Sequence, residues 1–112
     1  MTANTQQFVN YVLEQLDSIT ALSCVSFFGG IGLKQDAVQF AMAMGNVLYF
    51  VVDNATRTKY QAQGMSCFQY QTKVKTVYVN KYFTVPDDVI ENQELLTEWA
   101  KEAIQIARKL KK

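Results

Sequence analysis

Apolar residues recur every three or four positions near the start of the chain, which is the spacing of an amphipathic helix. Asn4 stands three residues before Gln7, and this pair can form a capping box in which each side chain bonds a free backbone N–H group. The pattern therefore predicts a helix that begins at Asn4 and ends near Ser18. Its recurring apolar residues are Phe8, Val12, Leu16 and Ile19.

Two later segments also have helical character. Asp53 and the residues after it supply caps for a short helix through about Gln63, and Gly64 suits the position just beyond its end. Asn92 caps a long last helix, whose acidic start and basic end complement the helix dipole. The apolar stripe of this last helix consists of Leu95, Leu96, Trp99, Ala103, Ile106 and Leu110.

Short runs of β-branched and aromatic residues, bounded by turn residues, fill the middle of the chain and predict strands. Gln35-Asp36 and Gly45-Asn46 are typical of tight turns, and Thr72-Lys73 lies near a third bend. Pro86, the only proline, ends this region. The predicted strands are Cys24–Phe28, Ile31–Lys34, Ala37–Met44, Val47–Val52, Phe68–Gln71, Val74–Tyr82 and Tyr82–Val85.

These elements predict an α+β fold in two layers. We expect an antiparallel sheet of about five to six strands with an N-terminal helix, a short middle helix and a long C-terminal helix. The length of 112 residues favours a single domain over residues 1–112. Hydrophobic residues make up 49% of the chain and charged residues 19%, which is typical of ordered globular proteins.

The hairpin Ala37–Val52 is apolar on both sides, whereas a sheet that is covered on one face usually alternates apolar and polar residues. Its second face must be covered either by elements of the same chain, such as the two terminal helices, or by a second copy. A two-residue loop would pair Met44 with Val47, Met42 with Tyr49 and Phe40 with Val51 on one side, and Ala43 with Leu48 and Ala41 with Phe50 on the other. The predicted interface residues are Ala41, Ala43, Leu48, Tyr49 and Phe50.

Charge and cysteine content leave few constraints on partners. Eleven Lys and Arg residues against ten Asp and Glu residues give a net charge of +1, which favours neither nucleic acid nor a membrane surface. Cys24 and Cys67 lie far apart and outside any C-x-x-C motif, so we expect reduced thiols. No apolar run approaches the roughly 18 residues that span a bilayer, and no signal-peptide pattern is present. We therefore expect a cytoplasmic protein.

Catalytic chemistry has few candidates in this sequence. The chain contains no histidine, which excludes Ser-His-Asp and Cys-His triads and histidine-ligated metals. Asp87 and Asp88 could form a carboxylate pair, but their place after Pro86 favours a helix start, and Cys24 in a strand favours a buried apolar role. Gly29-Gly30-Ile31-Gly32 lacks phosphate-loop spacing, so we interpret it as a bulge or a close backbone approach. We expect no catalytic, metal-binding or cofactor-binding residue, and no enzyme.

Lysines alternate with tyrosines along the later hairpin. Such a pattern could present stacking rings and phosphate-binding charges to single-stranded nucleic acid. Lysines on an exposed edge strand also prevent unwanted strand pairing, and this explains the pattern equally well. The candidate nucleic-acid contacts are Lys73, Lys75, Lys81, Tyr70, Tyr78 and Tyr82.

Five short motifs occur together along nearly the whole chain. They are F-V-N-Y-V-L-E-Q-L at Phe8–Leu16, F-G-G-I-G-L at Phe28–Leu33, V-Q-F-A at Val38–Ala41, L-Y-F-V-V-D at Leu48–Asp53 and Y-F-T-V-P at Tyr82–Pro86. In this order they resemble the TfoX/Sxy family, in particular the N-terminal domain of those regulators of DNA-uptake competence. The family-motif residues in this chain are Phe28, Gly29, Gly30, Gly32, Leu48, Tyr49, Asp53, Val85 and Pro86.

The resemblance implies an α+β domain and a non-enzymatic regulator of DNA transformation that acts through protein contacts. Such regulators are thought to assist the cAMP receptor protein at competence promoters. The resemblance thus implies transcription regulation, a transcription factor as protein partner and no cofactor, and a homodimer is a further expectation. The family usually has basic residues before F-G-G and V-P, where this chain has Val25, Ser26, Phe27 and Thr84, so no anion-binding role is expected there. Full-length regulators continue into a second helical domain, whereas this chain ends at Lys112.

Overall fold

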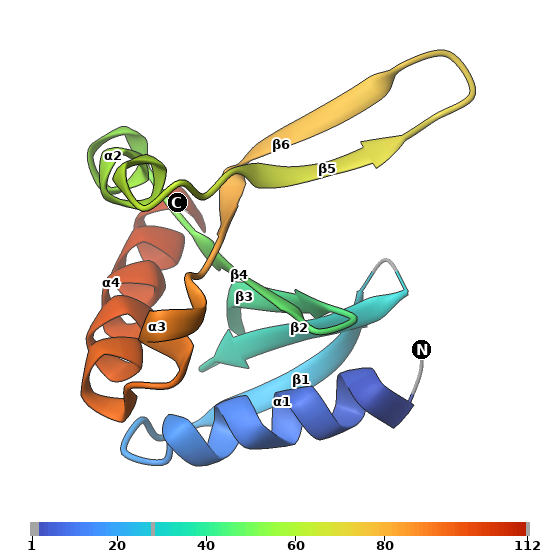
Figure 1. Cartoon of the computed structure of the whole chain (residues 1–112). Coiled ribbons are helices and arrows are strands. Elements are labelled where there is room, and N and C mark those ends of the chain that lie inside the picture. The colour runs from blue at the N-terminus through green and yellow to red at the C-terminus, as the bar shows by residue number, and fades with distance from the viewer. Residues whose placement is uncertain (1–2, 28, 112) are drawn as a thin grey trace.

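The computed structural model describes residues 3–27 and 29–111, and these residues form four helices and a six-stranded sheet (Figure 1). All neighbouring strands are antiparallel, in the order β1-β2-β3-β4-β6-β5. The predicted α+β class, with its N-terminal, middle and long C-terminal helices, is confirmed. In chain order the elements are α1 (Ala3–Gln15), β1 (Leu22–Phe27), β2 (Gly30–Gln35), β3 (Val38–Met44), β4 (Val47–Val51), α2 (Asn54–Ala62), β5 (Cys67–Gln71), β6 (Thr76–Thr84), α3 (Asp87–Ile90) and α4 (Gln93–Lys111).

The hairpin β5–β6 differs most from its prediction. β6 begins at Thr76 instead of Val74 and runs without a break to Thr84. The turn before it explains the shift, because the Thr72 hydroxyl accepts the backbone N–H of Lys75 at 3.1 Å and donates to the Lys75 carbonyl at 2.9 Å. Val74 is left at the tip of the hairpin, where it is 88% exposed.

The helix starts follow local capping signals. The Asn92 side chain accepts the backbone N–H of Leu95 at 3.1 Å, which confirms the predicted cap of α4. Asp87 and Asp88 form the first turn of α3, as predicted for a helix start. α1 already begins at Ala3, and the predicted cap at Asn4 lies outside the residues whose side chains are described.

Two tight turns connect β2, β3 and β4. Gln35 pairs with Val38, so the first turn consists of Asp36 and Ala37, one residue later than predicted. Both turn residues have a positive φ, 52° and 70°. Gly45, with a φ of 62°, lies in the turn between β3 and β4 as predicted. The register that follows has the four predicted pairs Ala41–Phe50, Met42–Tyr49, Ala43–Leu48 and Met44–Val47.

The helices cover one face of the sheet. α4 packs on β3 and β4, and α1 packs on β2 and β3. On the same face the Phe83 ring of β6 lies 6.2 Å from the Tyr60 ring of α2, measured between centroids. The side chains of this helix-covered face, none more than 4% exposed, are Ile31, Leu33, Ala41, Ala43, Leu48, Phe50 and Phe83.

Phe40 lies on the helix-covered face, which corrects the prediction that it shares a side with Met42 and Val51. The register of β2 and β3 shifts so that Leu33 pairs with Ala41 while the next residue of β2 pairs with Gln39. Phe40 is left in the resulting bulge, and its ring lies 6.0 Å from the Phe50 ring. A bulge of one residue changes the side to which the following side chains point.

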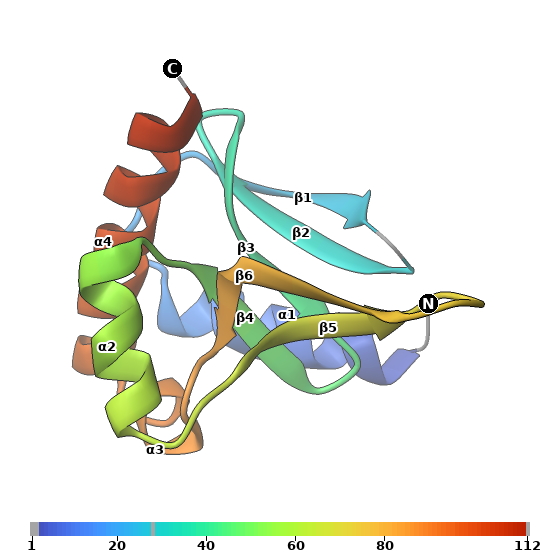
Figure 2. The same cartoon turned by 90° about the horizontal axis from the view of Figure 1, so that it is seen from above.

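The other face of the sheet is concave, because the sheet curls between β1 and β6 (Figures 1 and 2). The ring centroids of Phe27 on β1 and Tyr82 on β6 lie 6.4 Å apart, although three strands separate β1 from β6. The Gln39 side chain donates a hydrogen bond to the Tyr82 hydroxyl at 3.1 Å. Met42 and Tyr82 are therefore buried on a face that the helices do not cover.

Two glycines of β2 allow the strands to approach closely. A Cβ atom at Gly30 would meet the Ala43 carbonyl oxygen and the Met44 sulfur well inside contact distance. At Gly32 it would lie 2.6 Å from the Gln39 side chain, which occupies that space on its way to Tyr82. The geometry supports the structural interpretation of the glycine motif as a close backbone approach.

Replacing Gly30 by alanine should lower the free energy of unfolding by about 2 to 3 kcal/mol, because the added methyl group would push the β2 and β3 backbones apart. Urea denaturation followed by circular dichroism measures the loss. Gly64→Ala is the control, since nothing lies within 4 Å of its Cβ position. At Gly64, which has a φ of 78°, only the left-handed backbone conformation disfavours alanine, and the free energy of unfolding should fall by about 1 kcal/mol. Equal losses in the two variants would contradict the close approach.

Candidate protein-contact surface

The hairpin β5–β6 projects from the rest of the domain as an arm, defined as residues 68–79 (Figures 1 and 2). β6 pairs with β4 only from Tyr82 to Thr84, and the register of β5 against β6 shifts between Cys67 and Phe68. Beyond that shift, each strand of the arm has the other as its only strand neighbour in the described part of the chain. The arm is therefore a two-stranded ribbon without a third strand beside it.

One side of the arm is apolar and the other is polar. Directly opposed residues of an antiparallel pair share a side, which places Phe68 with Val79 and Tyr70 with Val77 on the apolar side. The polar side consists of Gln69, Gln71, Thr76 and Tyr78. Val77 and Val79 are half-buried, whereas Tyr70 is 42% exposed and Tyr78 61% exposed.

An aromatic row, defined as Tyr49, Phe68 and Tyr70, joins the concave face to the apolar side of the arm. The Tyr49 and Phe68 rings meet edge to face with centroids 5.3 Å apart, and the Phe68 and Tyr70 centroids lie 6.1 Å apart. Partial burial raises the pKa of the Tyr49 phenol, so that this ring stays neutral. Half-exposed aromatic rings beside valines suit contact with another protein surface.

The predicted interface in the Ala37–Val52 hairpin is corrected by the structure. Ala41, Ala43, Leu48 and Phe50 are at most 1% exposed, because the helices cover their face of the sheet. Tyr49 alone of this set is half-buried, and it lies on the opposite, concave face. Sequence reasoning missed the contribution of β5. The alternation of apolar and polar residues in Cys67–Gln71 is the signal that could have identified its apolar side.

The candidate nucleic-acid contacts do not form one surface, so the predicted alignment of rings and charges is wrong. Tyr70 and Tyr78 lie on opposite sides of the arm. Tyr82 is only 4% exposed and cannot stack on a base. Lys73 and Lys75 belong to the exposed end of the arm, between β5 and β6.

Lys81 lies apart from the other two lysines, near the base of the arm. Its ammonium nitrogen is 5.6 Å from the centroid of the Tyr82 ring. It lines an open pocket of about 350 Å³ together with Lys34 and Gln39. The three candidate lysines therefore do not present one charged stripe.

The family-motif residues stabilise the fold. The Val85 backbone N–H donates to the Leu48 carbonyl at 2.8 Å, which joins the end of β6 to β4, and both side chains are buried. Pro86 is the N-cap residue of α3. Gly29 adopts a φ of 80° before β2, and Phe28 lies outside the described residues.

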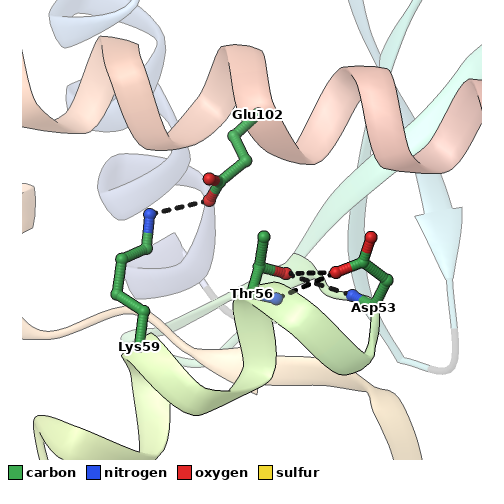
Figure 3. A network of polar contacts seen from close by, with 4 residues as sticks. All are labelled: Asp53, Thr56, Lys59 and Glu102. Atoms are coloured by element: carbon green, nitrogen blue, oxygen red, sulfur yellow. Dashed lines mark hydrogen bonds and ion pairs between the residues drawn. The ribbon is translucent and has the colours of Figure 1, made fainter.

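Asp53 connects the sheet to α2 through a capping box (Figure 3). Its carboxylate accepts the backbone N–H of Thr56 at 2.9 Å, and the Thr56 hydroxyl accepts the backbone N–H of Asp53 at 3.1 Å. Further along α2, the Lys59 ammonium lies 2.7 Å from the Glu102 carboxylate and 4.1 Å from the centroid of the Trp99 ring, both on α4. This polar network positions α2 on α4.

The described residues offer little for metal or thiol chemistry. They contain no group of three or more His, Cys, Asp or Glu side chains placed to hold a metal ion. Cys24 is exposed on β1, which corrects the predicted buried role. Partial shielding of its thiol from solvent still raises the pKa of the thiol above its ordinary value of 9.0, so that it stays protonated near neutral pH. Among the helices described, none combines the length and apolar character needed to cross a membrane. The aromatic row is therefore the surface with the clearest potential for contact.

The family model of the TfoX N-terminal domain matches residues 14–107. The match includes all six strands, the arm, α2, α3 and most of α4. A comparison with curated proteins gave no match.

Replacing Asp53 by alanine should lower the free energy of unfolding by about 1 kcal/mol near neutral pH, because α2 loses an acceptor for the Thr56 N–H. Asp53→Asn keeps an acceptor and should lose less. The bonded N–H of Thr56 lowers the pKa of the Asp53 carboxyl below its ordinary value of 3.8.

The contribution of this carboxylate is thus fully present above the unfolded-state pKa and is lost as the pH falls through the lower folded-state pKa. Urea titrations at about pH 7 and about pH 2.5 should show that the alanine penalty shrinks in acid. A penalty of the same size at both pH values would contradict this role of the charged carboxylate.

Proposed function

Because the chain belongs to the TfoX N-terminal domain family, we propose that it is a non-enzymatic regulatory module that acts through protein contacts, like the regulators of DNA-uptake competence. Its partner is a transcription factor, for which the resemblance points to the cAMP receptor protein at competence promoters. The contact uses the aromatic row and the apolar side of the arm. The observation that carries the proposal is a projecting ribbon with one apolar, half-exposed side.

The instability of a lone ribbon supports a protein contact at the arm. A two-stranded hairpin is at best marginally stable in water, and the described chain provides the arm with no third strand. A protein surface against Tyr70 and Val77 would remove apolar area from water, which contributes about 2 kcal/mol for each large side chain that becomes fully buried. Binding would thus stabilise the arm, which consists of only two paired strands.

The chemistry of the aromatic row also supports a protein partner. Tyrosine and phenylalanine are enriched in the buried centres of protein interfaces, where charged residues are depleted. Tyr49, Phe68 and Tyr70 carry no charge, and the charged Lys73 and Lys75 lie beyond them at the end of the arm. This order matches the apolar centre and polar rim of an interface.

The proposal requires no cofactor and no reaction. The TfoX N-terminal domain is not a known enzyme family, and the absence of histidine removes the commonest general base. A regulator of this kind would act in the cytoplasm, where its promoters are.

Tyr70→Asp should weaken binding to the partner about tenfold or more, because a carboxylate would replace a ring in the apolar centre of the contact. Tyr78→Asp is the matched control, since it makes the same change on the polar side of the same arm and should leave the affinity nearly unchanged. Titration calorimetry with the purified cAMP receptor protein of the same host, with cAMP and promoter DNA present, measures both affinities. Circular dichroism checks that both variants fold.

Equal losses in the two variants, or no binding by the wild-type protein, would count against the proposed contact. The same titration with DNA alone at low salt tests the nucleic-acid alternative. Binding that weakens steeply with added salt, and that Lys73→Gln with Lys75→Gln removes, would favour that alternative instead.

A further inference from the structure

β5 forms one edge of the sheet, and the described chain places no strand along its outer side. Proteins usually protect such an edge with lysine, proline or a covering segment, because its free backbone N–H and C=O groups can pair with another chain. β5, with the sequence CFQYQ, has no charged residue and no proline. The side chains of Gln69 and Gln71 along it are exposed, and in the described chain no strand pairs with its outer side, so the edge is open.

β5 is also complementary to itself. In an antiparallel pairing centred on Gln69, this residue would lie opposite the partner subunit's Gln69, and Phe68 would lie opposite the partner subunit's Tyr70. The two aromatic pairs would fall on the apolar side of the arm, and the glutamine pair on the polar side. Lys73 and Lys75 lie beyond the end of β5, so no like charges would face each other along the paired strands.

We infer that β5 is a dimerisation edge, which pairs antiparallel with β5 of a second copy in the register centred on Gln69. The two arms then form one four-stranded sheet, so that each unsupported ribbon gains a neighbouring strand. This contact goes beyond the proposed regulatory one, because it uses the edge of the arm and not its apolar side. Dimerisation would place two apolar sides next to each other and double the surface open to the partner.

The opposite edge of the sheet is a weaker candidate for this pairing. β1 has no charged residue either, but β2 pairs with it from Leu22 to Phe27, and β2 is itself held by β3 within the body of the domain. The Phe27 ring is already in contact with Tyr82 where the sheet curls. β5 belongs to a ribbon without a third strand, and so it gains more from a second copy.

Charges placed on the twofold axis test this register. Gln69→Lys and Gln69→Glu should each weaken dimerisation of the full chain about fivefold, because like charges would then face each other directly. An equimolar mixture of the two variants should dimerise more tightly than either one alone, since opposite charges then meet. Gln71→Lys is the control on the same strand and side, because it would face the partner subunit's uncharged Cys67. Sedimentation equilibrium measures the dimer dissociation constant of each of the three variants and of the mixture.

A disulfide across the axis gives a second test that does not depend on weak charge effects. With Cys24 and Cys67 replaced by serine, Gln69→Cys should form a linked dimer on oxidation by oxygen with copper–phenanthroline. Opposed Cα atoms in an antiparallel pair lie about 4.5 to 5.5 Å apart, within the reach of a disulfide. Tyr78→Cys, on the same side but one strand away from the edge, should remain unlinked.

A monomeric wild-type protein at about 0.5 mM, which would mean no useful affinity, would overturn the inference. So would a mixture of the charged Gln69 variants that associates no better than each alone, or equal crosslinking through Gln69→Cys and Tyr78→Cys. Gln69→Lys leaves Tyr70 in place. Lost dimerisation with retained binding of the cAMP receptor protein would therefore support the dimer edge independently of the regulatory contact. Val77→Asp changes the apolar side of the arm on β6, one strand away from the paired edge, so retained dimerisation with lost binding in this variant would separate the two contacts in the other direction.

Discussion

The domain depends on a close approach of β2 and β3 that only glycine permits. Gly30 leaves room for the backbone of β3, and Gly32 leaves room for the Gln39 side chain. Gln39 can then reach the Tyr82 hydroxyl, and Phe27 meets the Tyr82 ring from the far edge of the sheet. With the helices on one face, this curl lets the sheet cover part of its other face with its own ends. A second helical layer is not needed.

The same curl of the sheet determines where apolar side chains remain exposed to solvent. Burial is complete where the distant strands converge, so that Met42 and Tyr82 are at most 4% exposed. It declines along the aromatic row, from Tyr49 through Phe68 to Tyr70, as the arm leaves the body of the domain. The partly exposed rings of the aromatic row are therefore continuous with one another, and this continuity distinguishes them from apolar side chains that are exposed singly elsewhere, such as Tyr11 and Leu110.

Local patterns were sufficient to predict the elements and part of the register. Gly45 in its turn and Asn92 at its cap act over a few residues, and the structure has both. The candidate contact surface could not be predicted in this way, because it depends on contacts between residues that are far apart in the sequence. Phe40 changes face because of a bulge in the β2–β3 pairing, and Tyr82 is buried by Phe27. Apolar residues on both sides of a strand show that both faces need cover, but not whether a helix, the sheet itself or another molecule provides it.

The domain has two parts, the arm and the body, which consists of the described residues outside the arm. The described family-motif residues lie in the body, and most of the proposed contact lies on the arm. Gly30, Leu48 and Val85 hold the curled sheet together, and their neighbours leave little room for change. The arm carries Phe68 and Tyr70 beyond the register shift, where a changed side chain would alter a contact without disturbing the curl. Tyr49 belongs to both parts, because it lies in a motif strand and begins the aromatic row. Close packing therefore restricts substitution in the curled sheet, whereas exposed positions of the arm can change without a steric cost to the sheet.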